Sequence, residues 1–210
     1  IVMRKENWIW QRGKITSQSG GTLSYTDEGV FVPKDHWGFF IQNDPRTLDS
    51  QNEWHFDSST KKIRVYSATQ PVNVQVASVE FVINAAGRSH ITVGDLTVAG
   101  ANTTGINVTA SSNLIIQNNA VRDSGLDGIR VATSSYYVIR NNSVTNSNYS
   151  GINTYNNANH HETITDNTVD GTAMILGVGR LYAPAAIFSD ADYTLIQYNR
   201  EDHSGYNGMT

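Results

Sequence analysis

Residues 105–121 read GINVTASSNLIIQNNAV, residues 128–144 read GIRVATSSYYVIRNNSV, and residues 151–169 read GINTYNNANHHETITDNTV. The three segments share a Gly-Ile start and an Asn-rich end. Their shared aliphatic position belongs to a longer column: Ile83, Ile106, Ile129, Ile152, Ile187 and Met209. Successive members of this column are 23, 23, 23, 35 and 22 residues apart. A spacing that stays near two dozen residues indicates a repeat architecture.

The residue types indicate which repeat architecture it is. A second aliphatic column holds Val93, Ile116, Ile139, Ile164 and Ile196, and a third column holds Leu96, Asn119, Asn142, Asn167 and Asn199. Short β-branched runs broken by Asn, Ser and Gly leave no room for a helix and lack the leucine-rich consensus. We therefore expect a right-handed, single-stranded parallel β-helix, with an antiparallel sandwich as the alternative. Asn in the third column would adopt a left-handed backbone at a corner and hydrogen-bond from coil to coil.

Composition excludes some functions. The 210 residues carry a formal net charge of −4 and contain no Cys. Without a basic stripe to neutralise phosphates, we expect no nucleic-acid partner. No apolar run reaches membrane-spanning length, so we expect no membrane span. The chain begins without Met and stops within a repeat, which leads us to expect a monomeric piece of a longer protein.

The first 70 residues do not follow the repeat and are rich in aromatic residues. We expect residues 1–70 to form strands and hairpins, and residues 71–210 to form the coils. Residues 54–65 alternate apolar and polar residues on both sides of a polar turn, which predicts a hairpin. This region would pack as a lid on the first coil or offer aromatic rings to a sugar.

A resemblance supports the coil assignment. Residues 38–67, GFFIQNDPRTLDSQNEWHFDSSTKKIRVYS, resemble a segment that precedes the coils in many secreted bacterial β-helix proteins. The matching positions are Glu53, Trp54, Asp57, Thr60, Lys61, Ile63, Val65 and Tyr66. The chain as a whole resembles the pectate-lyase-like superfamily, which includes polysaccharide lyases and glycoside hydrolases. The resemblance implies a secreted or bacterial cell-surface protein with a polysaccharide or other glycan as its partner.

In that superfamily the substrate lies along one outer parallel face. If the first Ile column points inward, the next residues point outward: Asn84, Asn107, Arg130, Asn153 and Phe188. We expect Asn107, Asn153 and Phe188 to contact a substrate, together with Tyr155 from the following turn. The interval of 35 residues contains an insertion with Arg180 and Tyr182. These two side chains are further candidates, since insertions in solenoids often lie on a binding face.

The groups able to move protons lie in the outer column, in the case of Arg130, and in the adjoining turns. They are Asp127 and Arg130, His160 and His161, and Asp190 and Asp192. Neighbouring coils are about 4.8 Å apart, so the two Asp residues should approach the His pair. A hydrolase would need two facing carboxyl groups. A lyase would need a base, here Arg130, and a cation such as calcium held by Asp127 or by Asp190 and Asp192.

Each of these groups also has a structural interpretation. Arg130 would pair with Asp127, the His residues would lie at a loop tip, and Asp190 and Asp192 would shape a turn. The step Asp127-Gly128-Ile129 is similar to one in polygalacturonases, but Arg130 stands where that family has a further Asp. The other motifs of that family are absent, so we do not expect polygalacturonase activity.

Three functions remain open: a carbohydrate-active enzyme, a non-catalytic glycan-binding or adhesion module, and a structural spacer. The enzyme interpretation predicts clustered acids and an Arg with perturbed pKa values. The binding interpretation predicts exposed aromatic residues with no close carboxyl pair. The spacer interpretation predicts neither feature, and the fold alone does not decide.

Overall fold

The computed structural model describes residues 1–7, 9–27, 29–177 and 184–210. The chain divides into two compact units, Ile1–Val76 and Ala77–Thr210. The described residues form β-strands throughout, with one short 3₁₀-helix, η1 (Pro45–Thr47). No described helix is long and apolar enough to cross a membrane.

The first unit contains two antiparallel sheets. One has the order β3-β2-β1-β4, with β1 (Val2–Glu6), β2 (Ile9–Ser19), β3 (Thr22–Asp27) and β4 (Phe39–Phe40). The other is the hairpin of β5 (Trp54–Asp57) and β6 (Lys62–Val65), which pairs Trp54 with Val65 and Phe56 with Ile63. The hairpin prediction is confirmed. These four apolar side chains are exposed; whether they form a lid or a sugar platform stays a prediction.

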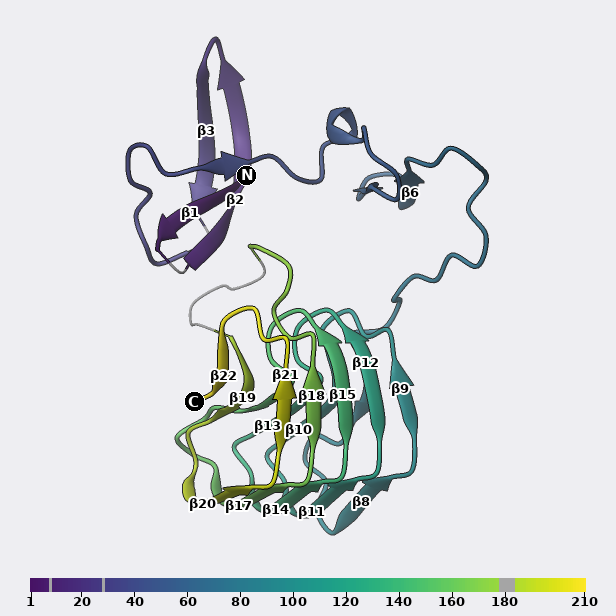
Figure 1. The fold of residues 1–210 in the computed structure, drawn as a ribbon, viewed down its shortest axis with the longest axis vertical. Coiled ribbons are helices and arrows are strands. Elements are labelled where there is room, and N and C mark those ends of the chain that lie inside the picture. The colour runs from purple at the N-terminus through teal and green to yellow at the C-terminus, as the bar shows by residue number, and fades with distance from the viewer. Residues whose placement is uncertain (8, 28, 178–183) are drawn as a thin grey trace. The chain divides into compact units, whose positions relative to one another are not determined.

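The second unit is a β-solenoid of three parallel sheets (Figure 1). Sheet A contains β7 (Phe81–Asn84), β10 (Thr104–Thr109), β13 (Ile129–Ala132), β16 (Ile152–Thr154), β19 (Ala185–Ser189) and β22 (Asn207–Met209). Sheet B contains β8 (Ile91–Gly94), β11 (Ser112–Gln117), β14 (Ser135–Arg140), β17 (His160–Thr165) and β20 (Asp192–Gln197). Sheet C contains β9 (Thr97–Ala99), β12 (Ala120–Ser124), β15 (Ser143–Ser147), β18 (Thr168–Asp170) and β21 (Arg200–Asp202).

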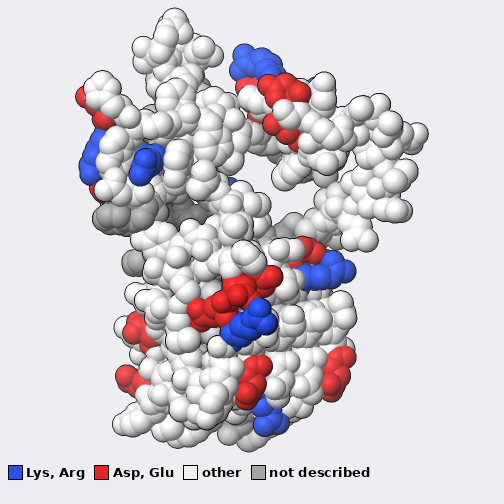
Figure 2. Space-filling model, in the orientation of Figure 1, with Lys and Arg blue, Asp and Glu red and all other residues white. Residues whose placement is uncertain are grey.

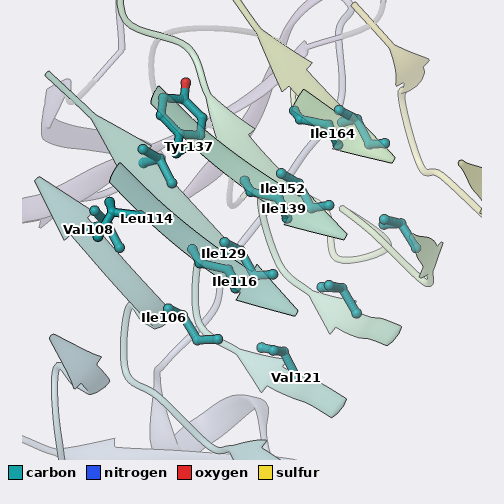
Figure 3. Packing of buried hydrophobic residues seen from close by; sticks show 14 of the residues in the cluster. Ile106, Val108, Leu114, Ile116, Val121, Ile129, Tyr137, Ile139, Ile152 and Ile164 are labelled. Carbon is teal, nitrogen blue, oxygen red and sulfur yellow. The ribbon is translucent and has the colours of Figure 1, made fainter. Parts of the chain in front are cut away.

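One strand from each sheet makes a rung, so that β7–β9 form rung 1 and β19–β21 form rung 5. The first two aliphatic columns read from the sequence are in register from rung to rung, as Ile106↔Ile129↔Ile152 and Ile116↔Ile139↔Ile164. Both columns point inward and are almost completely buried in their middle rungs (Figure 3). The expected parallel β-helix is therefore confirmed.

The recurring Gly before the Ile column has a packing cause. A Cβ on Gly128 would lie 2.3 Å from Cγ1 of Val144 and 2.7 Å from the carbonyl oxygen of Gly151. Gly105 and Gly151 are equally crowded at the same position of their rungs. On rungs 2, 3 and 4, Gly therefore lets the inward Val side chains of sheet C approach the start of the sheet A strand.

The Asn column forms a buried ladder of amides. Oδ1 of Asn142 accepts hydrogen bonds from the backbone N and from Nδ2 of Asn119, both at 3.0 Å. Nδ2 of Asn142 donates to the carbonyl oxygen of Ile116 at 2.9 Å and to Oδ1 of Asn167 at 2.9 Å. The pattern continues from Asn167 to Asn199. The coil-to-coil hydrogen bonding is confirmed.

The backbone at this corner corrects one detail. The left-handed residues lie one position before the ladder, at Asn118, Asn141, Asp166 and Tyr198, with φ between 54° and 58°. The ladder residues themselves are not left-handed, because their side chains must point inward to reach the neighbouring rungs. The tight turn and the hydrogen-bonded ladder are thus carried by two successive residues.

Candidate functional site

The outer column of sheet A is in the predicted register. Its members pair in order from rung 1 to rung 5: Asn84, Asn107, Arg130, Asn153 and Phe188. Asn107 is nevertheless buried, at 4% exposed, and its Nδ2 donates to Oδ1 of Asn84 at 3.0 Å. Arg130, Asn153 and Phe188 are partly exposed. Asn84 on rung 1 is exposed, so a ligand can reach every member of this column except the buried Asn107.

Asp127 lies just before β13 and is 4% exposed. Its Oδ1 accepts a hydrogen bond of 3.1 Å from Nδ2 of Asn153, one rung further along. Burial raises the pKa of Asp127 to about 6, although the Asn153 and Ser150 hydrogen bonds and the Arg130 charge act in the opposite direction. Asp127 can therefore hold a proton under mildly acidic conditions, and it belongs to one cluster with Arg130 and Asn153.

Asn153 connects this cluster to an aromatic pair. Its Oδ1 accepts a hydrogen bond of 3.1 Å from the backbone N of Tyr155. The Tyr155 ring stacks on Phe188 of the next rung, with ring centroids 4.4 Å apart and an interplanar angle of 22°. Tyr155 is 40% exposed, so the pair presents apolar ring surface beside polar side chains.

A second aromatic stack lies at the start of the sheet B strands. His161 lies between Tyr136 and Tyr193 of the neighbouring rungs, at centroid distances of 4.5 and 4.6 Å. All three residues are left-handed, with φ of 54°, 57° and 58° along the chain. This shared corner conformation places their side chains above one another. Tyr193 is 77% exposed although His161 covers one of its faces, so the opposite face of the ring is open.

One turn joins the two stacks. It runs through residues 155–159 on rung 4 and 190–191 on rung 5, between sheets A and B. The buried Asn159 holds it in place, since Nδ2 donates to the carbonyl oxygens of Val131 at 2.9 Å and Thr154 at 2.7 Å. Oδ1 of Asn159 also accepts from the backbone N of Ser134 at 2.8 Å. We call the surface of this turn and its two stacks the turn face: Tyr136, Tyr155, His160, His161, Phe188, Asp190, Asp192 and Tyr193.

The turn face contains six of the twelve residues singled out from the sequence: Tyr155, His160, His161, Phe188, Asp190 and Asp192. Asp192 pairs in register with His160, so these two positions lie on adjacent rungs as expected. Asp190 and Asp192 are both exposed. Among the residues that the structure describes, neither makes an ion pair with a His side chain. Arg180 and Tyr182 lie outside the described residues.

Glu162 is a buried group that the sequence did not single out as a site residue. It is 1% exposed and points into the solenoid, in register with Tyr137 and Thr194. Its Oε2 accepts from the Tyr137 hydroxyl at 2.7 Å, and its Oε1 accepts from Ser189 and Thr194. Burial and the Glu162 charge raise the pKa of Tyr137. Three hydroxyl donors thus satisfy the carboxylate inside the core.

The acidic groups do not gather into one centre. Among the described residues, no group of three or more His, Asp or Glu lies close enough to hold a metal ion. On the face that Figure 2 shows, a few acidic residues of the solenoid lie together beside a basic residue, the other charged residues are spread out, and no basic patch is present. The candidate site is therefore a face of aromatic, amide and His side chains, with the protonatable Asp127 at one end.

The rungs, inward columns and outer face define a parallel β-solenoid protein. Residues 81–209 match the family described as "Right handed beta helix region". This match covers more than half of the chain, and the chain belongs to that family. No curated protein and no solved structure matches the chain.

Proposed function

We propose that the solenoid is a glycan-binding module of a secreted or bacterial cell-surface protein of the pectate-lyase-like type. One observation carries the proposal: aromatic rings, His rings and exposed carboxylates lie on the turn face, and the amide of Asn153 lies next to it on sheet A. Aromatic rings can lie against the apolar face of a sugar. Neutral amides and hydroxyls pair with sugar hydroxyls as donors and acceptors.

The polysaccharide would run from the outer column of sheet A onto the turn face. Asn153 and Phe188 would contact it on sheet A, and Tyr155 and Tyr193 would supply ring surface on the turn. The exposed rings of Tyr155 and Tyr193 are the feature that the binding interpretation predicts, and they support binding as the first proposal.

The test is a binding screen of the whole chain against neutral and uronic polysaccharides by affinity electrophoresis. Tyr193→Ala should weaken binding about 3- to 10-fold, the range expected when one aromatic contact is lost. Tyr198→Ala is the matched control, because Tyr198 is on the same rung, is 79% exposed and is also left-handed. Absence of binding to every glycan would refute the proposal, as would equal losses in the two variants.

A second candidate function is cleavage of the bound polysaccharide, and the state of Asp127 favours it. A buried carboxyl with a pKa near 6 suits a general acid at mildly acidic pH. Reducing ends released by the chain and abolished in Asp127→Asn would support a hydrolase. Unsaturated products that depend on calcium and on Arg130 would support a lyase. If neither product forms while binding persists, the module only binds.

A further inference from the structure

The ring nitrogens of His160 and His161 lie close together although the two residues are consecutive in the chain. Their Nδ1 atoms are 2.9 Å apart. Successive side chains of a regular strand point to opposite faces, so this contact needs a break in the alternation. The left-handed backbone of His161, with φ of 57°, supplies that break at the start of β17.

The His161 ring is held in place before any ligand arrives. Tyr136 and Tyr193 cover its two faces at interplanar angles of 23° and 21°. The His160 ring meets the Tyr136 ring edge-on, at a centroid distance of 5.7 Å and an angle of 85°. Since both flat faces of His161 are covered, its ring edge, which carries the nitrogens, is the part left for a ligand. His161 is exposed.

The separation of the two nitrogens matches one coordination geometry. Imidazole nitrogens bind divalent metals at about 2.0–2.1 Å. Two such nitrogens at about 90°, as in a square-planar ion, lie about 2.9 Å apart, whereas tetrahedral ligands lie about 3.3 Å apart. We propose that His160 and His161 form a bidentate site for a square-planar divalent transition-metal ion, with Cu²⁺ the preferred ion.

The surrounding charge favours a cation. Asp192 is one rung away in register with His160, and Asp190 lies in the same turn. Because no third His, Asp or Glu joins the pair among the described residues, water completes the coordination. The ion would therefore stay open to an exchangeable ligand, and its binding needs no glycan.

Binding changes the position of one proton. In the ion-free protein one Nδ1 donates its hydrogen to the other Nδ1. Both Nδ1 lone pairs are needed for the metal, so the donating ring must lose this proton and take one up at Nε2 through solvent. A small rotation of the rings then aims both nitrogens at one point.

The experiment is a Cu²⁺ titration of the whole chain by calorimetry, with electron paramagnetic resonance of the bound ion. The variants imitate residues that already occupy the same columns. His161→Asn copies Asn113, which is also left-handed, and His160→Ser copies Ser135. His90→Asn is the matched control, because His90 is left-handed at the same corner of rung 1 and has no neighbouring His.

The expected result is one Cu²⁺ per chain with nitrogen couplings from two imidazoles. Each site variant should weaken Cu²⁺ binding by about 10-fold or more, whereas Zn²⁺ should bind more weakly to the unmodified chain. His90→Asn should leave the affinity unchanged. Equal Cu²⁺ binding by the unmodified chain and by both site variants would overturn the proposal, and so would a spectrum without two coupled nitrogens.

Discussion

Replacing Asn142 by Leu tests the amide ladder at a central, buried position. Asn142 is 1% exposed, and Leu removes the five hydrogen bonds that its side chain makes. Some partners keep another bond: Nδ2 of Asn119 still donates to the carbonyl oxygen of Val93, and Oδ1 of Asn167 still accepts from the backbone N of residue 142. The backbone N of Asn119 loses its acceptor, and the Ile116 carbonyl loses an amide donor.

The size of the effect follows from these partners. A buried polar group left without a partner costs about 1–3 kcal/mol. With one or two such groups, we expect Asn142→Leu to lower the free energy of unfolding by about 2–5 kcal/mol. Urea denaturation of the whole chain, followed by circular dichroism, measures it as a lower midpoint with an unchanged slope.

The neighbouring residue provides the control. Asn141 is exposed and left-handed, with φ of 54°. Asn141→Gly keeps the corner conformation and removes an amide outside the ladder, so it should change stability by about 0.5 kcal/mol or less. If Asn142→Leu costs no more than Asn141→Gly, the ladder does not stabilise the solenoid and the reasoning is refuted.

Three further predictions concern the core and Asp127. Between about pH 4 and pH 6, Asp127 of the folded protein holds a proton that the unfolded chain has lost. The free energy of unfolding should therefore fall as pH rises, by up to about 3 kcal/mol in total. Asp127→Asn should remove this pH dependence of stability. Denaturation at pH 4.5 and pH 7 checks this, and an unchanged slope against pH in the variant would contradict it. Glu162→Leu should cost about 3 kcal/mol or more, because three hydroxyls lose their buried acceptor, whereas Glu162→Gln should cost less; equal midpoints for the two would count against the network. Gly128→Ala should cost about 2 kcal/mol or more through the overlap with Val144 and the next rung, and a neutral midpoint would show that the rung can expand.

The β-helix fold and the outward residues of sheet A could be predicted from the sequence, because each stacked rung repeats the same pattern of inward and outward positions. The first column keeps its register even across the longer interval, since Ile152 pairs with Ile187. An inward aliphatic residue fixes its outward neighbour, so Asn153 and Phe188 were placed correctly on sheet A. The same logic led to the ladder, because a column of Asn between apolar columns must hydrogen-bond with itself when it is buried.

The directions of the side chains at the corners could not be predicted in this way. Each left-handed residue changes the phase of the side-chain alternation, so counting in steps of two does not carry through a turn. For this reason His160, His161 and Glu162 read as one polar turn, whereas β17 begins at His160 and Glu162 points into the core. The sequence did contain a signal for Glu162. Glu162 and Tyr137 occupy equivalent positions of adjacent repeats, so the two side chains should point in the same direction.

The sequence by itself determined the solenoid, its rung spacing and the residues that face outward on sheet A, since a stacked repeat has one way to bury its aliphatic columns. Only the tertiary structure decided which side chains meet. The stack of Tyr136, His161 and Tyr193 and the burial of Asp127 depend on atoms from different rungs, and the contact between His160 and His161 depends on the left-handed backbone of His161. Their positions follow from backbone conformation at the corners and from exclusion of water, which a one-dimensional pattern does not contain.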